Sequence, residues 1–379
     1  MSTLGRVKCA ILGSRGLVAQ RLLQRLSDHH WLAPVCIVGS SESEGMKVSE
    51  IPWSFGEPKP SLPELEVIGI GKNGELASHL ISIGVRIVFS ALPDSPASYI
   101  EEDLARAGLV VISHSTIHRH SKLVPLVVPE ANKEHLGLVD QQKDFGHGIL
   151  VACPNCMVVP LAISIAPLIR SLPARKITII TEQSLSGGGR PMLEKSRQGH
   201  FPDSQILGES LSVERELKRI LGKLDGVNLK PLVIDINAKC RRVNREFGHS
   251  ASVTVEFERS LSAHEVIETW SNFLSQERHS DLLSSQKSPL NFVTDIDSAI
   301  SLLNLHESSF SEELQEKTMS VFVGGVEVSK NVLRFDVASD NTVRGAAGNS
   351  VLLAELMMSQ GVIYDTKISA DQGKKIRQA

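Results

Sequence analysis

The sequence predicts an α/β protein in which a Rossmann-type, doubly wound parallel sheet precedes a second domain of α+β type. Two features predict the first domain. A strand, a glycine turn and a helix follow one another over 6–26, and the order strand, helix, strand recurs over 86–113, as in parallel sheets with right-handed crossovers. The third observation is that strands and helices after residue 156 lose this alternation, which is typical of an α+β domain.

Hydrophobic periodicity assigns the elements of the first half. Apolar residues form a strand over 6–12 and recur at helical spacing over 17–26, with Gly13 and Gly16 in the turn between them. The stretch 56–74 is rich in proline and glycine, and we expect a long excursion within the domain there. The other elements expected in this half are strands over 33–38, 86–90 and 109–113 and a helix over 95–107.

The second half is predicted to contain helices and strands in a less regular order. A capping box, Ser262-Ala263-His264-Glu265, opens one helix, and the serine-rich stretch 280–311 is expected to be an exposed excursion. The remaining elements expected are a helix over 155–171, a strand over 176–181, a glycine turn over 186–189, a polar loop to about residue 207, strands over 250–257, 319–328 and 332–338, and an apolar helix over 348–358.

Composition favours small-molecule chemistry in the cytosol. The chain has 379 residues, 41% of them hydrophobic, and a formal net charge of −3 with both signs interspersed. Such a charge pattern offers no basic stripe for nucleic acid and no polybasic segment for a membrane. The N-terminus lacks the apolar stretch of a signal peptide, and no run approaches the roughly 18 apolar residues of a spanning helix. We therefore expect a cytoplasmic protein that acts on a small molecule.

The glycine turn is a candidate dinucleotide site. Gly13-x-x-Gly16 between a strand and a helix leaves room for a pyrophosphate to approach backbone N–H groups, although glycines at such turns often serve only strand–helix packing. Glu42 follows the second strand, where a carboxylate accepts from a ribose 2′-hydroxyl, and this favours NAD. Arg15 in the turn can instead reach a 2′-phosphate. The choice between NAD and NADP stays open.

Cys156 is the candidate nucleophile. It stands in Cys153-Pro154-Asn155-Cys156, at the start of an apolar helix, and a helix N-terminus favours ionisation of a thiol. The C-x-x-C spacing also occurs in redox pairs and zinc sites, but no second C-x-x-C or H-x-x-H lies at suitable spacing, so we expect no metal. The alternative to a nucleophile is a buried, inert cysteine.

His249 is the candidate proton-transfer group. It follows Gly248 at the start of a predicted strand, where a rigid sheet can hold an imidazole near a thiolate. An ordinary histidine is the alternative, since the chain has 13 of them. Arg241, Arg242 and Arg245 crowd the same segment, either as a solvated face or with one of them as a fork for a substrate carboxylate. Thiol, imidazole and glycine turn together predict an oxidoreductase that works through a thioester.

The chain resembles the aspartate-semialdehyde dehydrogenase family, particularly its archaeal and fungal branch, over nearly its whole length. The first half matches the family patterns at 13–20 (G-A-T-G-x-V-G-Q), 88–93 (V-F-S-A-L-P), 118–120 and 124–132. The second half matches at 154–156 (P-N-C), Gln183 with 186–189 (Q-x-x-S-G-A-G), 242–243 with 248–249 (R-V-P-V-x-x-G-H) and 340–349.

The resemblance implies a role for each matching residue. Cys156 would form a thiohemiacetal with an aldehyde, and phosphate would release the oxidised acyl group as an acyl phosphate, the physiological direction being the reverse. His249 would be the general acid/base and Gln183 would orient the substrate. Arg242 would hold its carboxylate, and Arg119 would contribute to the phosphate site. Asn155 and Glu209 are further expected substrate contacts.

The resemblance also implies the cofactor, the domain limits and the assembly. NADP is the cofactor of the family, and a homodimer or homotetramer is expected. The dinucleotide-binding domain would span 1–155 plus 342–379, with the C-terminal helix returning to it, and the catalytic and dimerisation domain would span 156–341. The expected cofactor contacts are Gly13, Ser14, Arg15, Gly16, Leu17, Val18, Ser40, Glu42, Ser90, Leu92, Ser186, Gly187 and Asn349.

Departures from the family pattern concern the substrate shell. Met157 and Val158 replace serine and threonine, which removes hydroxyls that could line the anion site. The segment 208–212 reads Gly-Glu-Ser-Leu-Ser where the family has G-E-E-E-K, so a lysine and a carboxylate are lost. His114 replaces an asparagine. These changes keep open a reductase of an acyl-CoA or another acyl phosphate, and a catalytically retired regulatory paralogue.

Overall fold

A six-stranded parallel sheet forms the first half of the molecule. The computed structural model describes residues 5–61, 64–71, 75–276, 279, 281–303 and 312–363. The first sheet has the strand order β3-β2-β1-β4-β5-β6, with every neighbouring pair parallel. Its elements are β1 Val7–Leu12, α1 Leu17–Leu26, β2 Leu32–Gly39, β3 Val67–Gly69, α2 Glu75–Ser82, β4 Ile87–Ser90, α3 Asp94–Arg106, β5 Val110–Ser113, α4 Pro129–Asn132 and β6 Ile149–Ala152. This is the doubly wound order expected for a Rossmann-type sheet.

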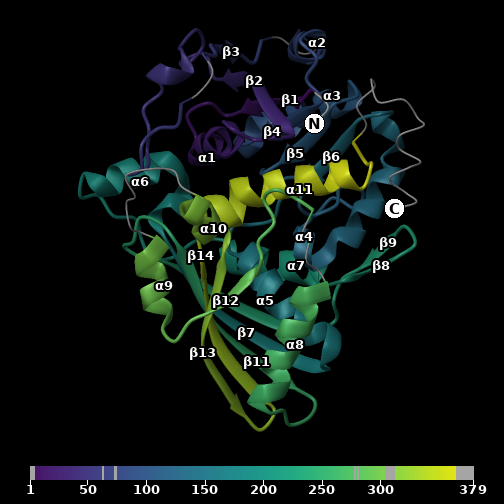
Figure 1. The fold of residues 1–379 in the computed structure, drawn as a ribbon, viewed down its shortest axis with the longest axis vertical. Helices are drawn as coiled ribbons and strands as arrows, with labels where there is room; N and C mark the ends of the chain where they lie inside the picture. Colours follow the sequence, from purple (N-terminus) through teal and green to yellow (C-terminus); the bar gives the residue numbers. More distant parts are fainter. Residues whose placement is uncertain are drawn as a thin grey trace.

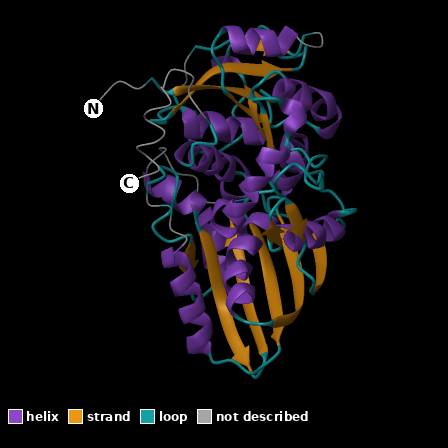
Figure 2. Ribbon diagram, turned by 90° about the vertical axis from the view of Figure 1, so that its right-hand side faces the viewer, coloured by secondary structure: helices purple, strands orange, loops and turns teal. Residues whose placement is uncertain are grey.

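The second half contains a mixed six-stranded sheet in the order β10-β7-β11-β14-β13-β12. Its long strands are the orange arrows in the lower part of Figure 2. Its central pairs, β7 with β11, β11 with β14 and β14 with β13, are antiparallel, whereas the two outer pairs are parallel. The elements are α5 Val158–Ser171, β7 Ala174–Gln183, α6 Gly189–Arg197, α7 Glu209–Ile220, β8 Lys223–Asp225, β9 Asn228–Lys230, β10 Asp235–Arg242, β11 His249–Phe257, α8 Ala263–Gln276, β12 Leu290–Phe292, α9 Ile296–Leu303, α10 Glu312–Met319, β13 Val321–Ser329, β14 Val332–Ser339 and α11 Gly348–Ser359.

The two faces of the second sheet differ. Strand residues such as Ile179, Val253 and Val337 share one apolar core with residues of α5 and α8, so these helices cover one face. On the other face α9 packs against Phe322 and Ala338 near one end of the sheet. Antiparallel sheets commonly bury one face in this way and leave polar residues on the other.

The last helix returns to the first sheet. Helix α11 crosses the molecule beside the parallel strands (Figure 1), and its Val351, Leu352 and Leu353 lie in one buried cluster with Ile11 and Phe89 of that sheet. A π-helical turn, Val343–Ala347, leads into α11 and is fully buried. The expected return of the C-terminal helix is therefore confirmed.

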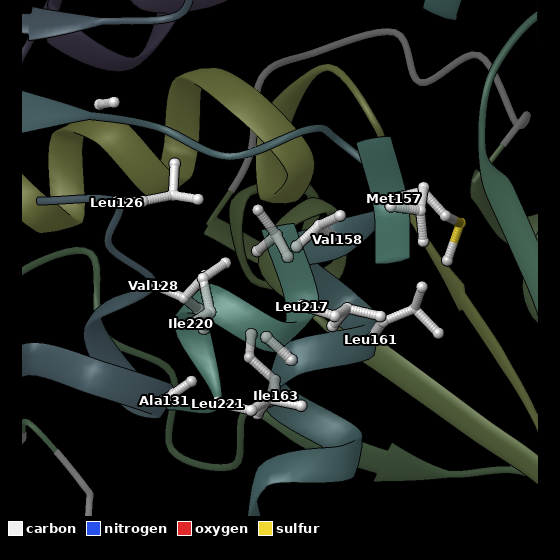
Figure 3. Close-up of a cluster of buried hydrophobic side chains, with 14 of the residues drawn as sticks. Leu126, Val128, Ala131, Met157, Val158, Leu161, Ile163, Leu217, Ile220 and Leu221 are labelled. Carbon is white, nitrogen blue, oxygen red and sulfur yellow. The ribbon is translucent and has the colours of Figure 1, made fainter. Parts of the chain in front are cut away.

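A shared core joins the two halves. Figure 3 shows Leu126 and Val128, which come from the segment before α4, against Val158 and Leu161 of α5 and Leu217 of α7. Residues of this kind each contribute roughly 1.5–3 kcal/mol when fully buried. Since the same apolar cluster contains strands of both sheets, the core holds the two halves in a fixed relation around the segment that carries Cys156.

Three local expectations need correction. Helix α5 begins at Val158 and not at 155, and the preceding residues form a turn in which the N–H of Val158 donates to the carbonyl oxygen of Asn155. The polar loop expected up to residue 207 contains α6, whose Leu193 is buried against Phe247. The described part of the excursion 280–311 contains β12 and α9, while 304–311 lies outside the described residues. None of the helices in the described ranges has the length and apolarity needed to cross a bilayer.

Candidate active site

A cavity of about 890 Å³ opens between the two sheets, and most of the predicted site residues line it. From the first sheet and its helices come Arg15, Gly16, Leu17, Val18, Ser40, Glu42 and Arg119. From the second half and its junction come Asn155, Cys156, Gln183, Ser186, Gly187, Glu209 and Arg242. The fold therefore brings together residues that are far apart in the sequence, at the carboxyl ends of parallel strands where ligands bind in such folds.

Cys156 is held in a short turn between β6 and α5. The carbonyl oxygen of Asn155 accepts from the N–H of Val158 at 2.9 Å, and the Asn155 side chain accepts from the N–H of Met157 at 2.9 Å. Gly345 packs against this turn so closely that a Cβ there would lie 2.9 Å from that of Cys156. The turn is thus fixed by backbone contacts on both sides, and the thiol faces the cavity.

His249 lies against the thiol. Its Nε2 is 3.2 Å from Cys156 Sγ, and the ring is fully buried at the first residue of β11. Gly187 gives the ring its space, because a Cβ at that position would lie 2.9 Å from His249 Nε2. A thiol and an imidazole in hydrogen-bond contact form the pair that nucleophilic cysteine chemistry requires.

The resting pair is neutral. Burial, and secondarily the charge of Glu209, raises the pKa of Cys156 to about 12, although Arg119 and Arg242 oppose this. Burial, followed by the charges of Arg242 and Arg245, holds the pKa of His249 well below its usual 6.5. Because both shifts disfavour the charged forms, the free protein carries a thiol beside a neutral imidazole at neutral pH.

Glu209 organises one wall of the cavity. Its Oε1 accepts from Asn155 Nδ2 and from Gln183 Nε2, both at 2.8 Å. The bond to Gln183 orients its amide at the end of β7, and the bond to Asn155 ties the carboxylate to the turn of Cys156. The carboxylate stands at the start of α7 and lines the cavity, where it offers a negative charge to a bound molecule.

The two arginines of the cavity have different partners. Arg242 Nη1 donates to the carbonyl oxygen of Ser184 at 2.7 Å, which leaves its positive charge without a carboxylate in direct contact in the described structure. Arg119 instead pairs with Glu216, with Nη1 3.1 Å from Oε1. Glu216 is fully buried and also accepts from the backbone N–H of Asn155 at 2.6 Å. The charge of Arg119 is therefore largely compensated within the protein.

The glycine turn fits a dinucleotide. Gly13 has φ of +103°, and a Cβ there would lie 2.6 Å from the carbonyl oxygen of Ala91, so only glycine keeps the turn close to the neighbouring strand. No side chain caps the first turn of α1, so its N–H groups remain available to a phosphate. Arg15 and Glu42 form an exposed ion pair at 3.1 Å at this end of the cavity.

The other predicted cofactor contacts lie deeper. Ser14 is buried and its hydroxyl is 3.0 Å from that of Ser43. Ser90, Leu92 and Asn349 are buried as well, and Asn349 Nδ2 donates to the carbonyl oxygen of Val127 at 3.3 Å. In this structure these residues are not among those that line the cavity.

Comparison with known proteins identifies the family. Residues 8–139 match the family described as "Semialdehyde dehydrogenase, NAD binding domain". An aspartate-semialdehyde dehydrogenase of Archaeoglobus fulgidus is 32% identical over 366 residues, covering 94% of this chain and 100% of that protein. The chain belongs to the aspartate-semialdehyde dehydrogenase family. Members of this family are NAD(P)-dependent oxidoreductases, which confirms the expected enzyme class and cofactor class.

Two further comparisons bear on the fold and on chemistry. The crystal structure of the aspartate-semialdehyde dehydrogenase of Candida albicans with NADP has a TM-score of 0.75 and 25% identity, covering 95% of this chain and 100% of that one. A protein named malonyl CoA reductase (NADP), from Metallosphaera sedula, is 29% identical over 374 residues, covering 94% of this chain and 98% of that protein. The expected fold class is confirmed.

One departure from the family pattern has a structural explanation. Met157 and Val158, which stand where the pattern given above has serine and threonine, are both fully buried, and Figure 3 shows them within the apolar cluster. Neither lines the cavity. In this protein the two side chains belong to the apolar core and not to the wall of the cavity.

Several residues around the site were not predicted from the amino-acid sequence. Ser184 and Asn341 contact His249 or its neighbours, and Glu216 binds both Arg119 and the turn of Cys156. For Glu216 a signal exists: it lies seven residues, about two helical turns, after Glu209 on α7, which places both carboxylates on one helix face. For Ser184 and Asn341 no local pattern reveals the contact.

The charge of Glu209 yields a prediction about the thiol. Glu209→Gln keeps the acceptor for Asn155 and Gln183 but removes the negative charge, so the pKa of Cys156 should fall and more thiolate should be present at any given pH. We expect alkylation of Cys156 by iodoacetamide at neutral pH to become about threefold to tenfold faster. Glu194→Gln, at the rim of the cavity, is the matched control. If the rate of Cys156 alkylation depends on pH in the same way in the wild type and in Glu209→Gln, Glu209 does not raise the pKa of the thiol.

Proposed function

We propose that this protein reduces an activated acyl group to an aldehyde with NAD(P)H, through a thioester on Cys156, and that the reaction is reversible. The observation that carries the proposal is the contact between Cys156 and His249, 3.2 Å from Sγ to Nε2, beside a cavity whose other end is formed by the glycine turn and α1. A nicotinamide cofactor bound there would supply the hydride. Family membership and an intact thiol–imidazole pair support an enzyme over a retired regulatory paralogue.

The bonds change in a defined order. Cys156 loses its thiol proton as its sulfur attacks the acyl carbon, and the bond from that carbon to the phosphate oxygen breaks, which gives a thioester and a phosphate that has taken up the proton; the thiolate that forms later in the cycle regains a proton from solvent. Hydride then adds to the thioester carbon. Collapse of this adduct breaks the C–S bond and returns its electron pair to sulfur as a thiolate, with the aldehyde as product. The proton consumed in the net reaction appears on the released phosphate.

We propose roles for the residues around the thiol. His249 hydrogen-bonds to the sulfur and to the oxyanion of each adduct. Gln183 orients the acyl group, and Arg242, which has no carboxylate partner in the described structure, binds a substrate carboxylate. Glu209 binds a substrate ammonium group. These charges suit aspartyl phosphate, with aspartate semialdehyde as the product, and this is our first choice of substrate.

The ion pair between Arg119 and Glu216 favours a second substrate class. This pairing leaves little positive charge on Arg119 for a phosphate leaving group, and residues 208–212 lack the lysine found in the family pattern. The relative named malonyl CoA reductase shares this fold over most of its length. Reduction of an acyl-CoA thioester by the same chemistry is therefore the second candidate.

A single assay separates the two candidates. Oxidation of aspartate semialdehyde is followed by formation of the reduced nicotinamide, with phosphate or coenzyme A as acceptor and with NAD or NADP. Phosphate-dependent turnover supports the first substrate, and turnover that requires coenzyme A supports the second. Malonate semialdehyde is tested in parallel, because it lacks the ammonium group that Glu209 would bind. Absence of turnover under all conditions, in protein whose Cys156 remains alkylatable, would refute both.

Cofactor preference depends on the pair Arg15–Glu42. We propose NADP as the cofactor, with NAD as the alternative that Glu42 favours. In Glu42→Gln the carboxylate no longer pairs with Arg15, so the guanidinium is free for a 2′-phosphate. We expect the ratio of kcat/KM for NADP over NAD to rise about tenfold, and further in Glu42→Arg. Glu44→Gln, in the same loop, should leave the ratio unchanged. An unchanged ratio in Glu42→Gln would place this pair away from the ribose.

We also propose a cytoplasmic homo-oligomer, a dimer or a tetramer. The second sheet leaves part of one face uncovered, with Ile180 47% exposed among polar residues such as Thr254 and Arg334. Family resemblance supports a partner there, and light scattering of the purified protein tests it. The domain limits that we propose are 1–155 with 342–379, and 156–341. Residues 364–379 lie outside the described structure.

A further inference from the structure

The imidazole of His249 faces Cys156 with one nitrogen and a buried polar chain with the other. Nε2 is 3.2 Å from Sγ, whereas Nδ1 is 3.1 Å from the backbone nitrogen of Ser184 and 3.0 Å from its hydroxyl oxygen. His249 and Ser184 are both fully buried. Protein groups, and not bulk water, therefore decide which ring nitrogen carries the proton.

The backbone of Ser184 sets the direction of the bond to Nδ1. An amide N–H can only donate, so Nδ1 must accept. In a neutral imidazole the single proton then sits on Nε2, the nitrogen that faces the sulfur. Protonation of both nitrogens would bring Nδ1–H against the N–H of Ser184. The same amide therefore disfavours the imidazolium form.

The hydrogen bonds of three side chains run in the same donor-to-acceptor direction, toward His249. The backbone N–H of Gly248 donates to Asn341 Oδ1 at 3.0 Å, which leaves Asn341 Nδ2 to donate to Ser186 Oγ at 3.0 Å. Ser186 Oγ lies 3.1 Å from Ser184 Oγ, and Ser184 Oγ lies 3.0 Å from Nδ1. Asn341 Oδ1 has a second lone pair and can also accept from Ser184 Oγ at 3.1 Å or from Ser186 Oγ at 3.3 Å. The arrangement in which each group donates in turn runs from Asn341 through Ser186 and Ser184 to His249.

We infer that Ser184, Ser186 and Asn341 are positioning residues that hold His249 in its Nε2–H tautomer, so that His249 presents a hydrogen-bond donor to Cys156 and not a lone pair. This rests on the proposed thioester chemistry for its catalytic meaning. In that cycle sulfur acts as a thiolate when it attacks and when it leaves, so a neutral donor at 3.2 Å suits both steps. The charged groups nearest the ring, Arg242 and Arg245, are both cations and also oppose an imidazolium.

The tautomer is measured directly in the whole protein. Nitrogen-15-labelled histidine is incorporated, and long-range proton–nitrogen correlation spectra are recorded at neutral pH without substrate. His249 is assigned as the signal missing from His249→Asn. We expect a protonated Nε2 and an unprotonated Nδ1. An Nδ1–H tautomer or an imidazolium would overturn the inference. Because no turnover is needed, this result is independent of whether the proposed reaction is found.

Variants of Ser184 and Asn341 test how far their side chains, and not only the backbone amide of Ser184, hold the tautomer of His249. Ser184→Ala removes one donor, and we expect kcat to fall about tenfold with little change in KM, less than the loss on removing the imidazole itself. Ser184→Thr restores the hydroxyl and should recover the rate. In Asn341→Asp the carboxylate draws both hydroxyls toward itself, so Ser184 Oγ can accept from Nδ1–H, and the His249 signals should shift toward the Nδ1-protonated form.

A matched control removes a buried hydroxyl elsewhere. Ser164→Ala deletes a fully buried serine hydroxyl on α5 that donates to the carbonyl oxygen of Pro160. It should leave the His249 spectrum and kcat unchanged. If Ser184→Ala and Asn341→Asp both leave the His249 signals unchanged, or if Ser184→Thr fails to recover the rate, the three residues have only a structural role and the inference is wrong.

Discussion

Cys156→Ser is expected to lower turnover by on the order of 10⁴-fold or more while cofactor binding is retained. The reason is chemical. A serine hydroxyl ionises far less readily than a thiol, and its ester is a poorer hydride acceptor and leaving group than a thioester. Cys156 sits in a turn held by backbone contacts that serine can keep, with the Asn155 carbonyl bonded to Val158 at 2.9 Å. Loss of turnover is therefore not expected to reflect unfolding.

Two measurements and one control make this test decisive. Turnover is measured with the acyl donor or aldehyde that the wild type accepts, and nicotinamide binding is measured by calorimetry or fluorescence quenching. Cys240→Ser, on β10 and also partly buried, is the control and should keep the wild-type rate. Substantial turnover by Cys156→Ser would rule out the thioester mechanism, whereas loss of cofactor binding as well would show a wider disruption.

His249→Asn is expected to lower kcat by about a hundredfold or more, with KM changed much less. The asparagine fills part of the ring's space beside Gly187 but does not reproduce the ring's hydrogen bonds to the sulfur on one side and to Ser184 on the other. His264→Asn, exposed on α8, serves as the control. A large rise in KM with unchanged kcat would instead make His249 a substrate-binding residue.

The pH dependence of the wild type gives a second check on His249. Burial and the nearby arginines hold its pKa well below 6.5, so the ring stays neutral as the pH falls through that value. The rate should therefore persist on the acid side of 6.5 and decline only at lower pH, when the ring takes up a second proton. A decline centred near 6.5 in the wild type that is absent from His249→Asn would show an ordinary, unperturbed histidine.

The parallel sheet could be predicted because its signals are local. Strand 6–12, the glycine turn and helix 17–26 each follow from residues adjacent in the chain, and the structure has β1 and α1 at these places. Helix α6 was missed for the opposite reason: it is short and polar, and its position depends on Leu193 packing against Phe247 from a distant loop. Propensity is a weak guide where tertiary packing decides.

The sequence by itself determined the fold class, the position of the glycine turn, and Cys156 and His249 as the candidate reactive groups, since each is marked by a residue type beside a recognisable strand or helix. Only the tertiary structure decided how these groups behave. The Arg119–Glu216 pair and the bond from Asn341 to Ser186 join residues 97 and 155 positions apart. Burial and such long-range contacts determine charge, tautomer and pKa, because these properties depend on the groups that surround a side chain in space and not on its neighbours along the chain.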